Sequence, residues 1–115
     1  MKERKKYFQC SHLAGRKYHE ADDVWNELHI GTLLRLEREL DNRYDKDAVA
    51  VMYDSIENGE SYILGYIPRN ENSTLAIFLE MGWDELFECR ISRISPDEHH
   101  ENQIEMTIKI KRKNK

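Results

Sequence analysis

The run of residues 32–53 constrains the fold of this chain most, because it holds two strand-like stretches separated by a short polar turn. Residues 32–39 alternate apolar and charged side chains, which predicts a half-buried strand. Residues 48–53 are apolar on both faces, which predicts a strand in the interior of a sheet. Loops that interrupt such strands with polar and aromatic side chains often carry function. We therefore expect the functional site at the turn, on three side chains: Asn42, Tyr44 and Asp45.

Four further strands and one main helix complete the predicted fold. The further strands are predicted at residues 7–14, 61–67, 84–92 and 103–111. Residues 70–81 are predicted to form the main helix, because apolar side chains recur in them at helical spacing. Asn72 is suited to cap this helix, and residues 24–28 are predicted to form a single helical turn. Six short strands with one main helix between the fourth and fifth predict an α+β, mainly β fold, which is a small, OB-like, partly open six-stranded barrel.

The length of 115 residues predicts one domain over residues 1–115, with its core at about residues 7–110 and basic, frayed ends. Such a chain has no room for a second lobe that closes over a substrate. It contains no apolar run long enough to span a bilayer, and its N-terminal basic residues lead into a strand-like segment rather than a signal peptide. We therefore expect a cytoplasmic protein without a membrane partner.

The formal charge of −4 conceals a strongly acidic body. Residues 2–6 carry four basic residues and one acidic residue, and residues 109–115 carry five basic residues. Residues 7–108 therefore hold nine basic and 21 acidic residues, a formal charge of −12. Proteins that coat duplex DNA neutralise its phosphates with a basic face. The charge argues against extended duplex binding and remains compatible with a small, local nucleic-acid site.

The sequence indicates neither a metal or cofactor site nor catalytic machinery. Cys10 and Cys89 lie in apolar-alternating segments without a CxxC spacing, so we expect two buried thiols and neither a zinc site nor a disulfide. The pair His99-His100 lies in an acidic loop without a distant partner, which is typical of solvated residues. Ser11 and His12 lack a third group that would orient them for nucleophilic catalysis. We therefore expect a binding module that is not an enzyme.

Five segments, taken in order, resemble the HIRAN domain. They are Gly15-Arg-Lys-Tyr18, Arg38-Glu39, Asp41-Asn-Arg-Tyr-Asp45, Asp47-Ala-Val-Ala-Val51 and Leu64-Gly-Tyr-Ile-Pro-Arg69. Each segment is common by itself, and their joint occurrence over about residues 7–110 makes the resemblance specific. The chain resembles a stand-alone, bacterial-type member of this family, which also occurs at the N-terminus of some DNA remodellers.

The resemblance implies a modified OB-like barrel that binds single-stranded DNA at its 3′-hydroxyl end and recruits or orients DNA repair or replication-fork factors, such as a helicase or nuclease in trans. It implies six DNA-binding residues: Lys17, Tyr18, Tyr44, Asp45, Tyr66 and Arg69. Tyr18 and Tyr44 match aromatic residues that stack on the terminal bases. Asp45 matches a carboxylate near the terminal hydroxyl. Lys17 matches a basic residue beside the first of these aromatic residues. Arg69 matches a basic position near the phosphates, and Tyr66 lies at the neighbouring site.

Two other functions remain open from the residues alone. The acidic body fits a protein-interaction domain that docks a basic partner, with the tyrosines as contacts at the rim. A small metal-dependent hydrolase would need clustered carboxylates. The only dense set is Asp41, Asp45 and Asp47, and Asp47 leads directly into a predicted buried strand.

Overall fold

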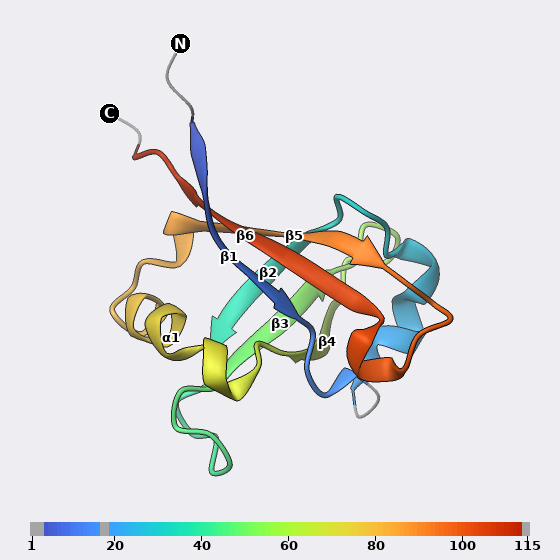
Figure 1. The fold of residues 1–115 in the computed structure, drawn as a ribbon, viewed down its shortest axis with the longest axis horizontal. Helices are drawn as coiled ribbons and strands as arrows, with labels where there is room; N and C mark the ends of the chain where they lie inside the picture. The colour runs from blue at the N-terminus through green and yellow to red at the C-terminus, as the bar shows by residue number, and fades with distance from the viewer. Residues whose placement is uncertain (1–3, 17–18, 114–115) are drawn as a thin grey trace.

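Six antiparallel strands form one curved sheet in the order β1-β6-β5-β2-β3-β4 (Figure 1). The structure is a computed structural model that describes residues 4–16 and 19–113. The strands are β1 (Lys5–His12), β2 (Leu33–Arg38), β3 (Val49–Asp54), β4 (Ser61–Tyr66), β5 (Phe87–Ile94) and β6 (Ile104–Lys111). Helix α1 (Ser73–Glu80) lies between β4 and β5, and short 3-10 helices form at Glu20–Glu27, Arg69–Glu71, Asp84–Leu86 and His100–Asn102. The predicted α+β, mainly β fold with six strands is confirmed.

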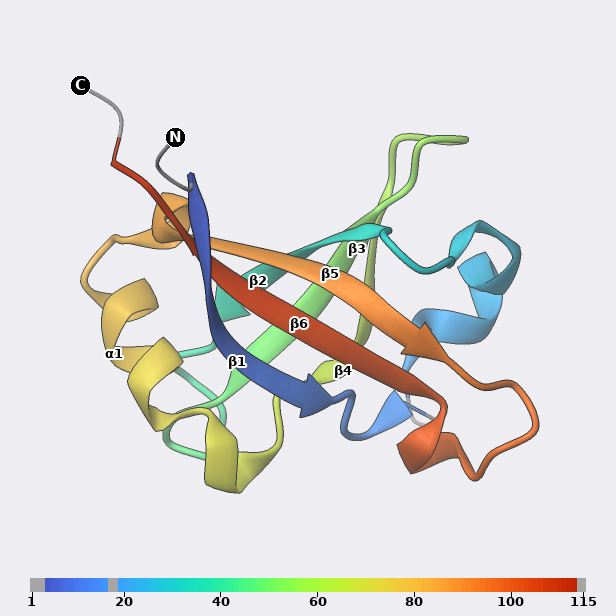
Figure 2. The same ribbon diagram turned by 45° about the horizontal axis from the view of Figure 1, so that its top comes forward.

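The two edges of the sheet approach each other, which curves it into a partly open barrel (Figure 2). Ala14, just beyond β1, exchanges two backbone hydrogen bonds of 2.8 and 2.9 Å with Tyr66 at the end of β4. Gly65 permits this approach, because a Cβ atom there would lie 2.4 Å from the Ala14 carbonyl oxygen. The edges meet at this isolated residue pair rather than along a ladder of described residues. The arrangement agrees with the predicted OB-like barrel.

The core is built from the inward-facing apolar side chains of the strands. Val49 and Val51 of β3 are buried together with the Ala50 between them, because β3 lies inside the sheet between β2 and β4. Alternation along β6 buries Ile104, Met106 and Ile108. Helix α1 covers one end of the barrel with Leu75, Ala76 and Leu79. The 3-10 helix Glu20–Glu27 packs against β4 near the other end and buries Ala21 and Val24.

The main helix is shorter than predicted. It begins at Ser73 rather than at residue 70, because Pro68 is extended and Arg69–Glu71 forms a separate 3-10 turn. Gly82 follows the helix with a φ of 91°, a left-handed conformation that favours glycine at this position. Among the described residues, no helix is long and apolar enough to cross a membrane.

One of the two thiols is not buried. Cys10 is exposed, because the register of β1 shifts between Tyr7 and Gln9 and the strand then turns Ser11 inward. The prediction of a buried Cys10 is therefore wrong. Cys89 on β5 is buried, as predicted, and burial raises the pKa of its thiol to about 12.

Candidate nucleic-acid interface

The polar turn after β2 is held in shape by its own side chains. The Asn42 Oδ1 atom accepts hydrogen bonds from the backbone N–H groups of Tyr44 (2.8 Å) and Asp45 (3.1 Å). The Asp45 Oδ1 atom accepts another from the backbone N–H of Asp47 (2.9 Å). Asn and Asp favour turns because their side chains bond to backbone groups a little further along the chain. The turn therefore has a defined shape, and it displays Tyr44, which is 77% exposed.

The second carboxylate oxygen of Asp45 connects the turn to the start of α1. This Oδ2 atom accepts a hydrogen bond of 2.7 Å from the side-chain amide of Asn72. Asp45 is half-buried, and Asn72 is buried. The predicted capping role of Asn72 is wrong, because its side chain makes no capping hydrogen bond and bonds to Asp45 instead. Both oxygens of Asp45 are therefore fixed by protein donors.

Arg69 joins the same region from the 3-10 helix that follows β4. Its guanidinium donates a hydrogen bond to the backbone carbonyl of Tyr44. A guanidinium carries five N–H donors, and Arg69 is exposed, so further donors remain available. Arg69 thus adds positive charge at the backbone of Tyr44.

Tyr66, at the end of β4, contacts the turn through Glu39. Its hydroxyl donates to the Glu39 carboxylate, whose oxygens lie 2.8 and 2.9 Å away, and Glu39 also accepts a hydrogen bond of 3.1 Å from the Asn42 amide. Burial raises the pKa of Tyr66 to about 12, assisted by the Glu39 hydrogen bond and by the negative charges of Glu39 and Asp41. The His19 ring packs edge-on against the Tyr66 ring at 5.3 Å. Tyr66 therefore joins β4, the turn and the loop that ends at His19.

Arg38, the last residue of β2, supports the turn and is missing from the residues predicted for the site. Its guanidinium donates to three backbone carbonyl groups at 3.0, 2.6 and 3.1 Å: those of Glu39, Lys46 and Ala48. It also pairs with the Glu80 carboxylate of α1 at 3.2 Å, and its side chain is only 10% exposed. The sequence holds one signal for it. Arg38 follows Leu34 and Leu36 at a spacing of two residues, so it lies on the same, inward-facing side of the strand. A charged side chain on that side is stable only when other groups bond to it.

Four of the six predicted DNA-binding residues gather at one end of the barrel: Tyr44, Asp45, Tyr66 and Arg69. In Figure 1 the turn projects from the lower end of the barrel, beside the segment that leads into α1. The other two, Lys17 and Tyr18, lie outside the described residues. Of the described residues near them, Ala14 bonds to the Tyr66 backbone and the His19 ring packs against the Tyr66 ring.

Arg16, which precedes Lys17, adds no free positive charge to this region. Its side chain is 4% exposed and pairs with Asp22 at 2.7 Å. Its guanidinium carbon lies 4.4 Å from the centroid of the Trp25 ring, which is a cation–π contact. Arg16 therefore fixes the loop after β1 to the 3-10 helix Glu20–Glu27.

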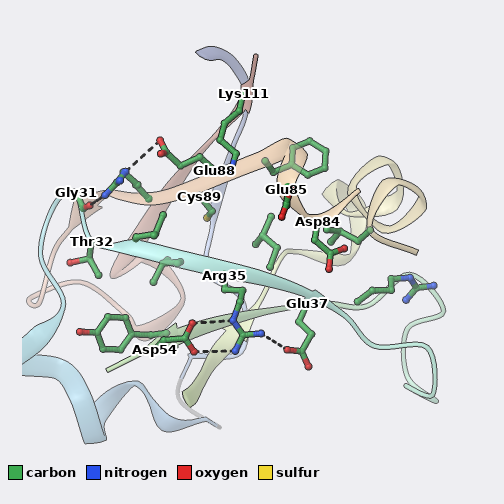
Figure 3. Close-up of a pocket in the computed structure, with 18 of the residues that line it drawn as sticks. Gly31, Thr32, Arg35, Glu37, Asp54, Asp84, Glu85, Glu88, Cys89 and Lys111 are labelled. Atoms are coloured by element: carbon green, nitrogen blue, oxygen red, sulfur yellow. Dashed lines mark hydrogen bonds and ion pairs between the residues drawn. The ribbon is translucent and has the colours of Figure 1, made fainter. Parts of the chain in front are cut away.

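A separate groove lies between β2 and β5 (Figure 3). The two strands pair at Leu33 and Leu34 of β2 and diverge beyond them. Arg35 in this groove pairs with Asp54 at 3.0 Å and with Glu37 at 2.6 Å, and the hydrogen bond from Arg35 lowers the pKa of Asp54. Further carboxylates line the groove: Asp84, Glu85 and Glu88. The groove includes none of the four described DNA-binding candidates, and its acidic lining is unsuited to phosphates.

Comparisons with known proteins show which family has this architecture. The family model of the HIRAN domain matches residues 6–113. The crystal structure of a protein from Lactobacillus plantarum is similar with a TM-score of 0.74 and 20% sequence identity, over 92% of this chain and 94% of that chain. The HIRAN domain of human HLTF is similar with a TM-score of 0.57 and 20% identity, over 93% of this chain and 80% of that chain. No curated protein sequence gives a significant match.

The two solved structures support the fold, and the family model spans nearly the whole chain. The chain therefore belongs to the HIRAN domain family, whose members are in general DNA-binding domains.

Proposed function

We propose that this domain binds single-stranded DNA at its 3′-hydroxyl end. The observation that carries the proposal is the Asp45 carboxylate, whose two oxygens are fixed beside an exposed aromatic ring and an exposed arginine. A carboxylate beside an internal phosphodiester is repulsive, because both groups are anions. At a strand end, a neutral hydroxyl can instead donate a charge-assisted hydrogen bond to the carboxylate. Asp45 therefore favours the end of a strand over its interior.

The side chains around Asp45 are suited to hold the last nucleotides. Tyr44 exposes its ring for stacking, which contributes ~1–3 kcal/mol per base and needs no particular base. Arg69 offers N–H donors to a phosphate, and Tyr66 borders the site beside the turn. Lys17 and Tyr18 lie outside the described residues, and we assign them a second basic and a second stacking contact from the family resemblance alone.

This function is that of a binding module without catalytic activity of its own. A site of this size binds only one strand end. The acidic body of the domain, residues 7–108, then stays away from the phosphates of the DNA, which it would repel. Bound in this way, the domain would recruit or orient DNA repair or replication-fork factors at the end. The partner would be a helicase or a nuclease acting in trans, which the bound domain would bring to the 3′ end.

The proposal is tested by comparing a linear and a circular single strand of the same sequence in fluorescence-anisotropy titrations at low salt. The linear strand should bind more tightly, because only it has a 3′-hydroxyl. Asp45→Ala should reduce this difference, while Asp23→Ala, an exposed carboxylate on the 3-10 helix Glu20–Glu27, serves as the matched control and should leave it unchanged. Equal affinity of the wild type for both strands would contradict end recognition.

The acidic groove between β2 and β5 favours a second candidate function, the docking of a basic protein segment. Asp84 and Glu85 in this groove have no ion-pair partner among the described residues. They are therefore available to basic side chains of another protein. If neither the linear nor the circular strand binds at low salt, this function replaces the first.

A further inference from the structure

We propose that Asn72 is a positioning residue, which orients the Asp45 carboxylate and thereby sets the preference for a 3′-hydroxyl end. This inference rests on the function proposed above and concerns how this chain achieves it. Asn72 is absent from the residues that the family resemblance assigns to the site. It is 1% exposed, so it acts through Asp45 rather than by touching DNA.

The hydrogen bond between the two side chains has a single possible direction. A carboxylate accepts hydrogen bonds and does not donate them, so the amide nitrogen of Asn72 must face Asp45. The Nδ2–Oδ2 distance is 2.7 Å, which is short for an amide donor and typical of a bond to a charged acceptor. Together with the Asp47 N–H on Oδ1, this bond fixes the plane of the Asp45 carboxylate.

Apart from its bond to Asp45, the Asn72 side chain makes no hydrogen bond among the described residues. Its side chain does not cap α1. Its Oδ1 atom is buried without a hydrogen-bond partner among the described residues, and a buried polar atom in that state is unfavourable. An apolar side chain would avoid this cost. Such a local cost is typical of positions that serve a site rather than the core.

The backbone of Asn72 is held as firmly as its side chain. Its carbonyl accepts the hydrogen bond of the Ala76 N–H at 2.8 Å, in the first turn of α1. The amide is therefore fixed to the helix, and α1 is fixed to the barrel through Leu75 and Leu79. The amide of Asn72 on α1 therefore holds the Asp45 carboxylate in one orientation. The turn alone would hold only its Oδ1 atom, through the Asp47 N–H.

The test uses the affinities of the full chain for two short single strands that differ only in ending with a 3′-hydroxyl or a 3′-phosphate. Asn72→Leu replaces the amide by methyl groups of nearly the same shape and so removes the donor, while Asn72→Ala removes the donor and leaves a small cavity, because the side chain is buried. We expect a wild-type preference of about tenfold or more for the hydroxyl, in line with a hydrogen bond to a charged group. Both variants should lower this preference below about threefold, chiefly by weakening the hydroxyl-ended complex.

Ser55→Ala is the matched control for general loosening of the fold. Ser55 is buried and hydrogen-bonded to Glu27 at the other end of β3, so its loss should lower the melting temperature and keep the preference. A full preference in folded Asn72→Ala and Asn72→Leu would overturn the positioning role and leave the proposed function standing. Absence of a preference in the wild type would instead overturn the end-binding function, and the positioning role with it.

Discussion

Tyr44 and Tyr66 belong to the same proposed site, yet the structure uses their rings differently. Tyr44 is 77% exposed, and its backbone rather than its side chain bonds to Asn42 and Arg69. Tyr66 is half-buried, with its hydroxyl on Glu39. One tyrosine is displayed and the other also supports the fold, so their substitutions should have different consequences.

Tyr44→Ala should weaken binding of single-stranded DNA by about 1–3 kcal/mol, because a base loses its stacking surface. Tyr44→Phe should cost little, since the ring face rather than the hydroxyl contacts the base. The melting temperature should stay nearly unchanged in both variants, because the side chain is exposed. Anisotropy titrations and thermal denaturation measure the two effects. A lower melting temperature with intact DNA binding would show that Tyr44 is structural.

The hydroxyl of Tyr66 should make the stability of the protein depend on pH under alkaline conditions. A tyrosine in an unfolded chain ionises near pH ~10. Burial and the Glu39 hydrogen bond raise the pKa of Tyr66 to about 12 in the folded protein. The unfolded state therefore loses this proton first, and the free energy of unfolding should fall as the pH rises from the unfolded value to the folded one.

Urea denaturation at several alkaline pH values measures this fall, and Tyr66→Phe isolates the contribution of Tyr66. The comparison is needed because burial and the Glu27 hydrogen bond raise the pKa of Tyr53 as well. Tyr66→Phe should lose less stability over the same pH range than the wild type. An identical decrease in both proteins would contradict the role assigned to the Tyr66 hydroxyl.

At the scale of secondary-structure elements, the turn after β2 depends on Arg38. Arg38→Met should remove the Arg38 donors from three carbonyl groups and destabilise the protein by about 1.5–3 kcal/mol, the range for hydrogen bonds to charged groups. It should also weaken DNA binding, because Tyr44 and Asp45 lie on the turn that Arg38 supports. Urea denaturation and anisotropy titrations provide the two measurements.

Arg35→Met is the matched control on the same strand. The Arg35 side chain is 44% exposed and forms surface ion pairs, so its loss should cost less than about 1 kcal/mol and leave DNA affinity unchanged. If Arg38→Met behaves like Arg35→Met, the turn does not depend on Arg38.

The elements of this fold are predictable because hydrophobic periodicity reports which face of a segment is buried. Residues 32–39 contain β2 and residues 48–53 contain most of β3, with the polar turn between them as expected. The register shift in β1 that exposes Cys10 leaves no such pattern. It places one extra residue of β1 opposite β6, and nothing in the amino-acid types of β1 indicates where this happens. Boundaries therefore depend on features that local periodicity does not report.

The supports of the site are harder to predict, because they join residues far apart in the chain. A local rule assigns Asn72 to capping, whereas its actual partner is Asp45, 27 residues away. Arg38 stands out in the sequence as a charge in an inward register, but its carbonyl partners become visible only in the folded turn. Tyr44 and Asp45 are predictable from the family pattern, while the contacts that hold them are not.

At the scale of the whole molecule, the approach of the two sheet edges lies beside the proposed site. The Ala14–Tyr66 pair brings Ala14, just after β1, beside the end of β4, where the turn and Arg69 also lie. The described part of the proposed site therefore draws on two segments that are distant in the sequence, the turn after β2 and the residues from Tyr66 to Arg69. Loss of barrel closure should reduce stability and DNA binding together.

Gly65→Ala should disrupt this closure. Its Cβ atom would lie 2.4 Å from the Ala14 carbonyl oxygen and 3.0 Å from the Leu13 side chain, so the backbone of Ala14 must move. We expect a loss of about 1–3 kcal/mol in the free energy of unfolding, as for other overpacked positions, and weaker DNA binding. Gly59→Ala is the control, because no described residue other than its chain neighbours has an atom within 4 Å of its Cβ position, and its cost comes from a φ of 76° alone. DNA binding as strong in Gly65→Ala as in Gly59→Ala would contradict the link between closure and the site.

The most direct test of the account is the ratio of the affinities of the wild type for single strands that end in a 3′-hydroxyl and in a 3′-phosphate, measured in one buffer. The phosphate should cost about 1.5–3 kcal/mol, the value of a hydrogen bond to a charged group, before any repulsion is added. Asp45→Asn should weaken the hydroxyl-ended complex and narrow the ratio, because it removes the repulsion and keeps part of the hydrogen bonding. A phosphate at the 5′ end, as the control, should change neither affinity. Equal affinity of the wild type for the two 3′ ends would contradict end recognition by Asp45.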